Sequence, residues 1–60
     1  AGLTLREREV IEHVLDGDSE QQIVEKLYIS LSTVKKHVYN AYRKLNVNNR
    51  VQLKNLFDGK

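Results

Sequence analysis

The segment from Ser30 to Leu45 constrains the fold most strongly, because it has two unlike faces when it is placed on a helix. At about 100° per residue, one stripe is apolar and consists of Leu31, Val34, Val38, Ala41 and Leu45. The opposite stripe is polar and basic and consists of Ser32, Lys36, Tyr39 and Arg43. No Asp or Glu occurs between Glu25 and Asp58. The pattern predicts a helix that buries one face in a core and presents a cationic, hydrogen-bonding face to a partner.

Two capping boxes mark the starts of two earlier helices. Thr4 is followed three residues later by Glu7, and Ser19 is followed in the same way by Gln22. In this pattern each side chain accepts a hydrogen bond from a backbone amide at the start of the helix. Gly17 lies between these two segments and suits the left-handed conformation that ends many helices. Helices are therefore expected at about 5–15 and 20–27.

The connection before the third helix is very short. Only residues 28 and 29 separate the second helix from Ser30, which is a natural N-cap. Helices joined by so short a turn cannot fold back antiparallel, so they must cross steeply as in a helix-turn-helix. Asn46 can end the third helix, and Asn48 or Asn49 can cap a fourth. The predicted fold is all-α, a four-helix bundle containing a helix-turn-helix, with helices at about 5–15, 20–27, 31–45 and 49–57.

Length and composition exclude several classes of function. A single domain of 60 residues buries only about 60% of the surface that its unfolded chain exposes, so no catalytic cleft and no enzyme activity are expected. The absence of cysteine excludes a disulfide framework and fits a reducing compartment. His13 and His37 alone do not make a metal site, and no cofactor is expected. No apolar run approaches the roughly 20 residues of a membrane span, so we expect a soluble, intracellular domain without a membrane partner.

Charge is strongly polarised along the chain, although the net charge is only +2. Residues 1–25 carry two basic and seven acidic side chains, a net charge of −5. Residues 26–60 carry eight basic and one acidic side chain, a net charge of +7. One side of such a molecule would attract a polyanion. A solvated basic face without a partner would give the same count, so charge alone does not decide between the two.

Three stretches of sequence together match a known pattern. They are LTLREREV at 3–10, GDS at 17–19, and IVEKLYISLSTVKKHVYNAYRKLNV at 23–47 followed by Arg50. The third stretch meets the pattern ISxxTVKxHxxNxxxKLxV at every specified position. From Leu3 to about Phe57, the chain resembles the LuxR/GerE-type helix-turn-helix domain, the C-terminal DNA-binding module of many bacterial transcription regulators.

This resemblance implies sequence-specific binding to double-stranded DNA. The helix at about 31–45 would enter the major groove, and the helix at about 20–27 would lie across the DNA backbone. By position, the base contacts of the family fall on Lys35, Lys36 and Tyr39. Contacts to the DNA backbone are expected from Ser32, Thr33, Asn40 and Arg43.

Three residues of this helix have other roles open to them. The hydroxyl of Thr33 could support the cap of its own helix. Asn40 borders both faces and could equally bond a phosphate or the neighbouring helix. His37 lies at the edge of the apolar stripe, so packing with one hydrogen bond is favoured over contact with DNA.

Two departures from the family concern helix ends. Tyr28 holds a turn position that is often Gly in other helix-turn-helix proteins, and a positive φ there would cost strain. Asn46 replaces the usual Gly, which is a mild change because Asn tolerates the same conformation.

The resemblance also implies a dimer through the last helix. There Val51 is a lone apolar residue on a polar strip that includes Asn48, Lys54 and Asn55. The strip is well below the roughly 1,000 Å² of a stable interface, so the domain alone is expected to be a monomer or a weak homodimer. Dimerisation would be completed on an inverted-repeat operator or by the N-terminal regulatory domain. Further implied are RNA polymerase as a partner, a location in the bacterial cytoplasm, and an N-terminal receiver or ligand-binding domain, with residues 1–60 as the C-terminal part of a larger regulator.

Glu7 is a charged residue that helical spacing turns inward, beside Val10 and Val14. We expect its carboxylate to cap the first helix and to pair with Arg50 of the last helix.

Two other functions are weighed against the LuxR-type prediction. The promoter-reading region of a sigma factor shares this helix plan, but Lys44-Leu45-x-Val47 followed by Arg50 favours the LuxR-type domain. A helical protein-binding module would instead use the acidic face of the first helix, formed by Glu9, Glu12 and Asp16. Nothing near these carboxylates supplies the apolar pocket that raises a catalytic pKa, so a solvated acidic face is expected.

Overall fold

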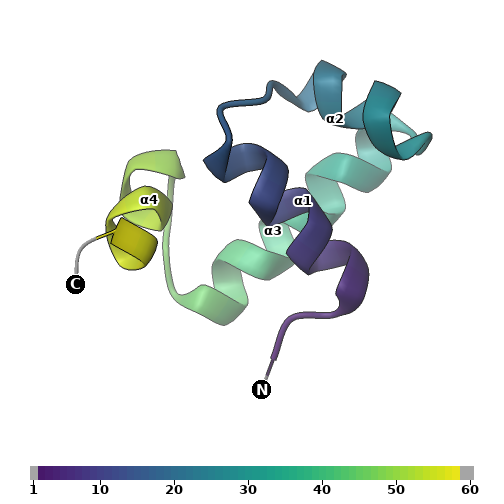
Figure 1. The fold of residues 1–60 in the computed structure, drawn as a ribbon. Helices are drawn as coiled ribbons and strands as arrows, with labels where there is room; N and C mark the ends of the chain where they lie inside the picture. Colours follow the sequence, from purple (N-terminus) through teal and green to yellow (C-terminus); the bar gives the residue numbers. More distant parts are fainter. Residues whose placement is uncertain (1, 59–60) are drawn as a thin grey trace.

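A computed structural model describes residues 2–58, and within that range it contains four helices and no strand. The helices are α1 (Leu5–Leu15), α2 (Glu20–Leu27), α3 (Leu31–Leu45) and α4 (Arg50–Asp58) (Figure 1). The predicted all-α, four-helix fold is confirmed. The first three helices have the predicted bounds, and α4 begins and ends one residue later than predicted.

Both capping boxes form as the sequence predicts. At the start of α1, the Glu7 amide donates to Thr4 Oγ1 over 3.1 Å, and the Thr4 amide donates to Glu7 Oε1 over 2.9 Å. At the start of α2, the Gln22 amide donates to Ser19 Oγ over 3.2 Å, and the Ser19 amide donates to Gln22 Oε1 over 2.8 Å. These contacts satisfy amides that have no partner within the helix, so they fix where each helix begins.

The ends of the later helices also follow local sequence signals. Ser30 Oγ accepts from the amide three residues on, over 3.2 Å, and Asn49 Oδ1 does the same over 2.9 Å at the start of α4. Within residues 2–58, three residues adopt positive φ, namely Gly17 at 93°, Tyr28 at 57° and Asn46 at 60°. The left-handed conformation costs a residue with a Cβ about 1–2 kcal/mol, so Tyr28 is a strained position in the helix-turn-helix.

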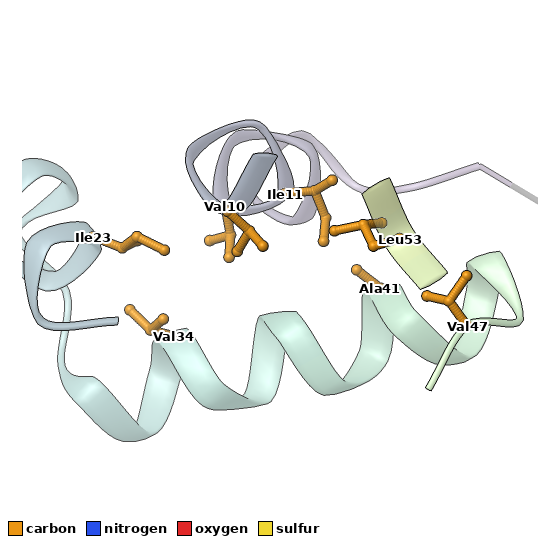
Figure 2. Close-up of a cluster of buried hydrophobic side chains, with 8 residues drawn as sticks. Val10, Ile11, Ile23, Val34, Ala41, Val47 and Leu53 are labelled. Carbon is orange, nitrogen blue, oxygen red and sulfur yellow. The ribbon is translucent and has the colours of Figure 1, made fainter. Parts of the chain in front are cut away.

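The core is a row of side chains along one face of α3 (Figure 2). Ile23 of α2 lies above Val34 near the start of α3, and Leu53 of α4 lies near Ala41 towards its end. Val10 and Ile11 of α1 fill the middle of the row, which also includes Val14 and Val47. Because α1 and α2 pack directly on α3 and α4 packs on α1, the core lies on one side of α3 and the opposite side is left exposed.

Candidate nucleic-acid interface

The outward stripe of α3 consists of Ser32, Lys36, Tyr39 and Arg43, and all four side chains are exposed. Lys35, at the edge of the stripe, is exposed too. Val34 and Ala41, on the opposite side of the helix, are fully buried. Among residues 2–58, the cations Lys35, Lys36 and Arg43 form no salt bridge, so their charge is not cancelled by a carboxylate of the described chain.

Hydroxyl groups gather at the first turn of α3. Ser30 Oγ lies 2.7 Å from Thr33 Oγ1 and 3.2 Å from Ser32 Oγ. Thr33 is half-buried, whereas Ser32 is exposed. The Thr33 hydroxyl therefore takes part in the cap of its own helix, which is the alternative role that the sequence left open.

Tyr39 and Arg43 contact each other along the stripe. The guanidinium carbon of Arg43 lies 5.8 Å from the centre of the Tyr39 ring, within the range of a cation–π interaction. The next residue, Lys44, extends the other way, and its Nζ donates to Glu7 Oε1 of α1 over 2.8 Å. Two adjacent cations thus differ in their partners, since Lys44 is bound by a carboxylate of α1 and Arg43 contacts the Tyr39 ring.

A shallow hollow separates the outward stripe from the start of α1. It has a volume of about 370 Å³ and is lined by Glu7, Asn40, Arg43 and Lys44. Asn40 is half-buried at this edge. Its side chain makes no hydrogen bond within residues 2–58, so both roles proposed for Asn40 stay open.

The predicted pair between Glu7 and Arg50 is wrong. Glu7 is inward and only 4% exposed, as expected, but its carboxylate binds Lys44 of α3. Arg50 instead donates to the backbone oxygen of Asp18 over 3.3 Å. The reason is the arrangement of the helices: Glu7 lies in the first turn of α1 beside the end of α3, whereas Arg50 lies beside the loop after α1.

Lys44 changes the titration of Glu7. Its hydrogen bond, followed by that from the Thr4 amide, holds the pKa of Glu7 below the ordinary value of 4.5, although burial opposes this shift. The carboxylate is therefore held in its charged form at neutral pH, and it ties the first turn of α1 to the last turn of α3.

Asp18 is a structural residue to which the sequence analysis gave no role beyond its place in the GDS match at 17–19. It is 9% exposed, and its Oδ2 accepts from Lys26 Nζ at 2.8 Å and lies 3.0 Å from His13 Nδ1. The Lys26 hydrogen bond lowers the pKa of Asp18 below its ordinary 3.8, and the His13 contact adds to this against the effect of burial. Asp18 thus joins α1, α2 and, through Arg50, α4.

The only local signal for this role is the position of Asp18 directly before the N-cap Ser19, in a loop of four residues. A loop so short holds its side chains close to the helices that it joins. The burial of Asp18 nevertheless depends on how α1, α2 and α4 pack, which the local sequence does not state.

The strip predicted to form a dimer, which lies on α4 and in the segment just before it, is exposed in this chain. It consists of Asn48, Val51, Lys54 and Asn55, and Val51 is 68% exposed. Leu53 is fully buried on the other side of α4, while Leu56 and Phe57 are about half exposed. The strip is therefore accessible to a partner, and its role in a dimer stays a prediction.

The acidic face of α1 is solvated. Glu12 and Asp16 are exposed, and Glu9 is half-buried and paired with Arg6 over 3.1 Å. No group of three or more His, Cys, Asp or Glu within residues 2–58 is placed to hold a metal ion. None of the helices in this part of the chain is both long and apolar enough to cross a membrane.

Two helices joined by a tight turn, the second with an exposed cationic face, define the helix-turn-helix class of DNA-binding domains. Residues 1–57 match the family described as "Bacterial regulatory proteins, luxR family". The chain belongs to this family of transcription regulators, whose helix-turn-helix domain binds DNA and which is not a family of enzymes. The resemblance inferred from the sequence is confirmed, and the family match favours it over the promoter-reading region of a sigma factor.

Relatives with described roles support the same conclusion. The chain is 54% identical over 50 residues to the transcriptional regulatory protein DegU of Brevibacillus brevis, covering 83% of this chain and 21% of DegU. It is 47% identical over 55 residues to a nitrate/nitrite response regulator protein homolog of Haemophilus influenzae, covering 92% of this chain and 26% of the relative. It is 44% identical over 50 residues to the spore germination protein GerE of Bacillus subtilis, covering 83% of this chain and 68% of GerE.

The matched segment spans only about a fifth to a quarter of two of these relatives, namely 21% of DegU and 26% of the H. influenzae protein. No solved structure matches the chain.

Proposed function

We propose that α3 of this domain enters the major groove of DNA and reads base edges with Lys35, Lys36 and Tyr39. Lysine can donate to O6 and N7 of guanine, and a helix fits the width of the groove. Phosphates would be contacted by the residues around this centre, which are Ser32, Thr33, Asn40 and Arg43. In this arrangement α2 lies across the DNA backbone and braces α3.

This proposal rests mainly on the lack of carboxylate partners for the cations of the outward stripe. Lys36 and Arg43 are exposed and form no salt bridge within residues 2–58, whereas Lys44 on the inner side is engaged by Glu7. Helix positions that place cations in solvent without partners favour a polyanionic ligand. The family match independently supports DNA as that ligand.

The proposal also covers the dimer, the rest of the regulator and its partners. The exposed strip of Asn48, Val51, Lys54 and Asn55 would form a weak homodimer, so that two copies read an inverted-repeat operator. DegU and the H. influenzae relative are several times longer than the matched segment, which supports residues 1–60 as one part of a longer regulator. We place this part at the C-terminus, after an N-terminal receiver or ligand-binding domain. Such a regulator would act in the bacterial cytoplasm and would contact RNA polymerase.

Selection of bound sequences from random duplex DNA tests the assignment of the base contacts. The wild-type chain should enrich a defined motif, and Lys36→Ala and Tyr39→Ala should each relax the preference at one or two positions of the motif. Arg8→Ala is the matched control, because Arg8 is an exposed cation that belongs to α1 and not to the stripe. An unchanged motif in both stripe variants would overturn the base-contact assignment.

Salt dependence separates DNA binding from a protein-binding role of the acidic face of α1. Several phosphate contacts make the affinity for DNA fall steeply as salt increases. A domain that works through Glu9, Glu12 and Asp16 would bind DNA only weakly, and this affinity would depend little on salt. Substitutions in the stripe would leave its affinity for a protein partner unchanged.

A further inference from the structure

Tyr39 and Arg43 are neighbours on the outward stripe and lie within the range of a cation–π contact. They are one helical turn apart, both are exposed, and Tyr39 is 61% exposed. The guanidinium carbon of Arg43 lies 5.8 Å from the centre of the Tyr39 ring. We infer that Tyr39 is a positioning residue for DNA binding, because its ring holds the Arg43 guanidinium in place to contact a phosphate. This inference rests on the proposed function and assigns Tyr39 a role beyond base reading.

The chemistry of the guanidinium permits stacking and phosphate binding at once. Its plane can cover an aromatic ring while the five N–H donors at its edge remain available to an anion. A lysine at the same position has no plane to stack and would bind phosphate only as a point charge. An arginine at position 43 can therefore contact a DNA phosphate while the ring of Tyr39 restrains its guanidinium.

The surroundings of Arg43 explain why Arg43 is available to a phosphate and the neighbouring Lys44 is not. Lys44 Nζ is 2.8 Å from Glu7 Oε1, so its charge is directed inward to α1. Arg43 forms no salt bridge within residues 2–58; its guanidinium carbon lies 5.8 Å from the centre of the Tyr39 ring, and its side chain lines the hollow together with Asn40. The guanidinium thus has an aromatic neighbour that restrains it and no described carboxylate that competes for it.

Restraint before binding should increase affinity for any DNA sequence. A long, mobile side chain loses conformational freedom when it is fixed on a phosphate, and a side chain that is already restrained loses less. A phosphate contact carries no sequence information, so this contribution must appear on unrelated DNA as well as on the operator. Reading of a base by Tyr39 would appear on the operator alone.

The test measures the dissociation constant on an unrelated duplex across a range of salt concentrations. Arg43→Ala should weaken binding and reduce the slope of log K against log salt by about 1. Tyr39→Leu removes the ring and should weaken binding by about two- to fivefold, the size of a cation–π contact at an exposed site. Tyr39→Phe keeps the ring and should bind the unrelated duplex like the wild type.

The double variant decides whether Tyr39 acts through Arg43. Tyr39→Leu combined with Arg43→Ala should bind no more weakly than Arg43→Ala alone, because the ring then has no guanidinium to hold. Losses that add in the double variant, or an unrelated-duplex affinity that Tyr39→Leu leaves unchanged, would overturn the positioning role. Helix content by circular dichroism checks that each variant is folded.

Lys36→Ala, measured beside these variants, keeps the two proposals apart. If it weakens binding while Tyr39→Leu and Arg43→Ala are additive, α3 still binds DNA and only the positioning role is wrong. If Lys36→Ala, Arg43→Ala and Tyr39→Leu all bind both the selected operator and the unrelated duplex like the wild type, α3 is not the DNA-binding helix, and the proposed function and the inference are both wrong.

Discussion

The two sides of α3 use positive charge in opposite ways. On the inner side, Lys44 is bound to the buried carboxylate of Glu7. On the outer side, Lys36 and Arg43 are exposed and form no salt bridge within the described residues. A charge bound within the protein fixes the position of a helix, whereas a charge left in solvent is available to a ligand. Of two adjacent cations in one helix, Lys44 therefore stabilises the fold and Arg43 remains available to a ligand.

A second buried carboxylate extends this comparison to the rest of the molecule. Asp18 is bound by Lys26 and His13, and its backbone oxygen accepts from Arg50. Glu7 and Asp18, the two acids that are buried within residues 2–58, are thus both bound by basic side chains. The net charge of +2 is therefore a poor guide to function, because the location of each carboxylate partner decides which cations remain available to a ligand.

The largest effect should come from the apolar part of the inner side. Val34→Ala removes two carbon groups from a fully buried position and leaves a cavity against Ile23 and Val10. We expect a loss of about 2 kcal/mol in the free energy of unfolding, measured by urea titration. Lys36→Ala on the outer side should change this free energy by less than about 0.5 kcal/mol. Equal losses in the two variants would break the division between the sides.

The bound charge on the inner side should show coupling with its observed partner. Glu7→Gln and Lys44→Met should each lower the melting temperature by several degrees, since each leaves the other group without its partner. The double variant should lose less than the sum of the two. Glu7→Gln with Arg50→Gln is the control and should be additive, because Arg50 binds Asp18 instead. Coupling in the control and none in the first pair would contradict the structure.

Acid should weaken the fold through the same two carboxylates. The pKa values of Glu7 and Asp18 are held below the ordinary 4.5 and 3.8, so the folded state binds these protons less readily than the unfolded state. Their contribution is complete above those ordinary values and is lost as the pH falls through the lower pKa of the folded state. Stability measured from about pH 7 to about pH 3 should therefore fall less steeply in Glu7→Gln and Asp18→Asn than in the wild type. Glu12→Gln, at an exposed site, should keep the wild-type slope.

Much of the fold could be predicted because its signals are local. Thr4 with Glu7, Ser19 with Gln22, and Ser30 all act within one helical turn, and these contacts set the helix starts. The stripe of α3 also follows directly from helical periodicity, since residues three and four apart share a face. The Tyr39–Arg43 contact has this same spacing, so the sequence held a signal for it that the prediction did not use.

Partners of the buried charges could not be predicted in the same way. Glu7 and Lys44 are 37 residues apart, and several cations in the second half of the chain were equally available to Glu7 by sequence. Lys44 already had a sufficient local explanation as a cation at the negative end of a helix. Which cation reaches Glu7 depends on how α1 crosses α3, a property of packing over the whole core.

The smallest effect should come from the acidic side of the molecule. Glu12 lies on the exposed face of α1. The buried face of α1 packs against the buried face of α3, so the exposed face of α1 and the outward stripe of α3 lie on opposite sides of this contact. The shortest dimension of the molecule is 17 Å, whereas the Debye length is about 8 Å at about 0.15 M salt. Glu12→Lys should therefore raise the affinity for unrelated DNA by less than about twofold at this salt.

At about 0.01 M salt, where the Debye length is about 30 Å, the same substitution should have a clearly larger effect. The affinity for DNA should rise because the substitution adds positive charge, and the size of the increase depends on how strongly salt screens this charge across the domain. Glu12→Gln, which changes the charge by half as much, should have about half the effect on the logarithm of the affinity. An increase of tenfold or more for Glu12→Lys at about 0.15 M salt would mean that the exposed face of α1 lies close to the DNA. The comparison between an acidic side turned away and a basic side turned towards the ligand would then be wrong.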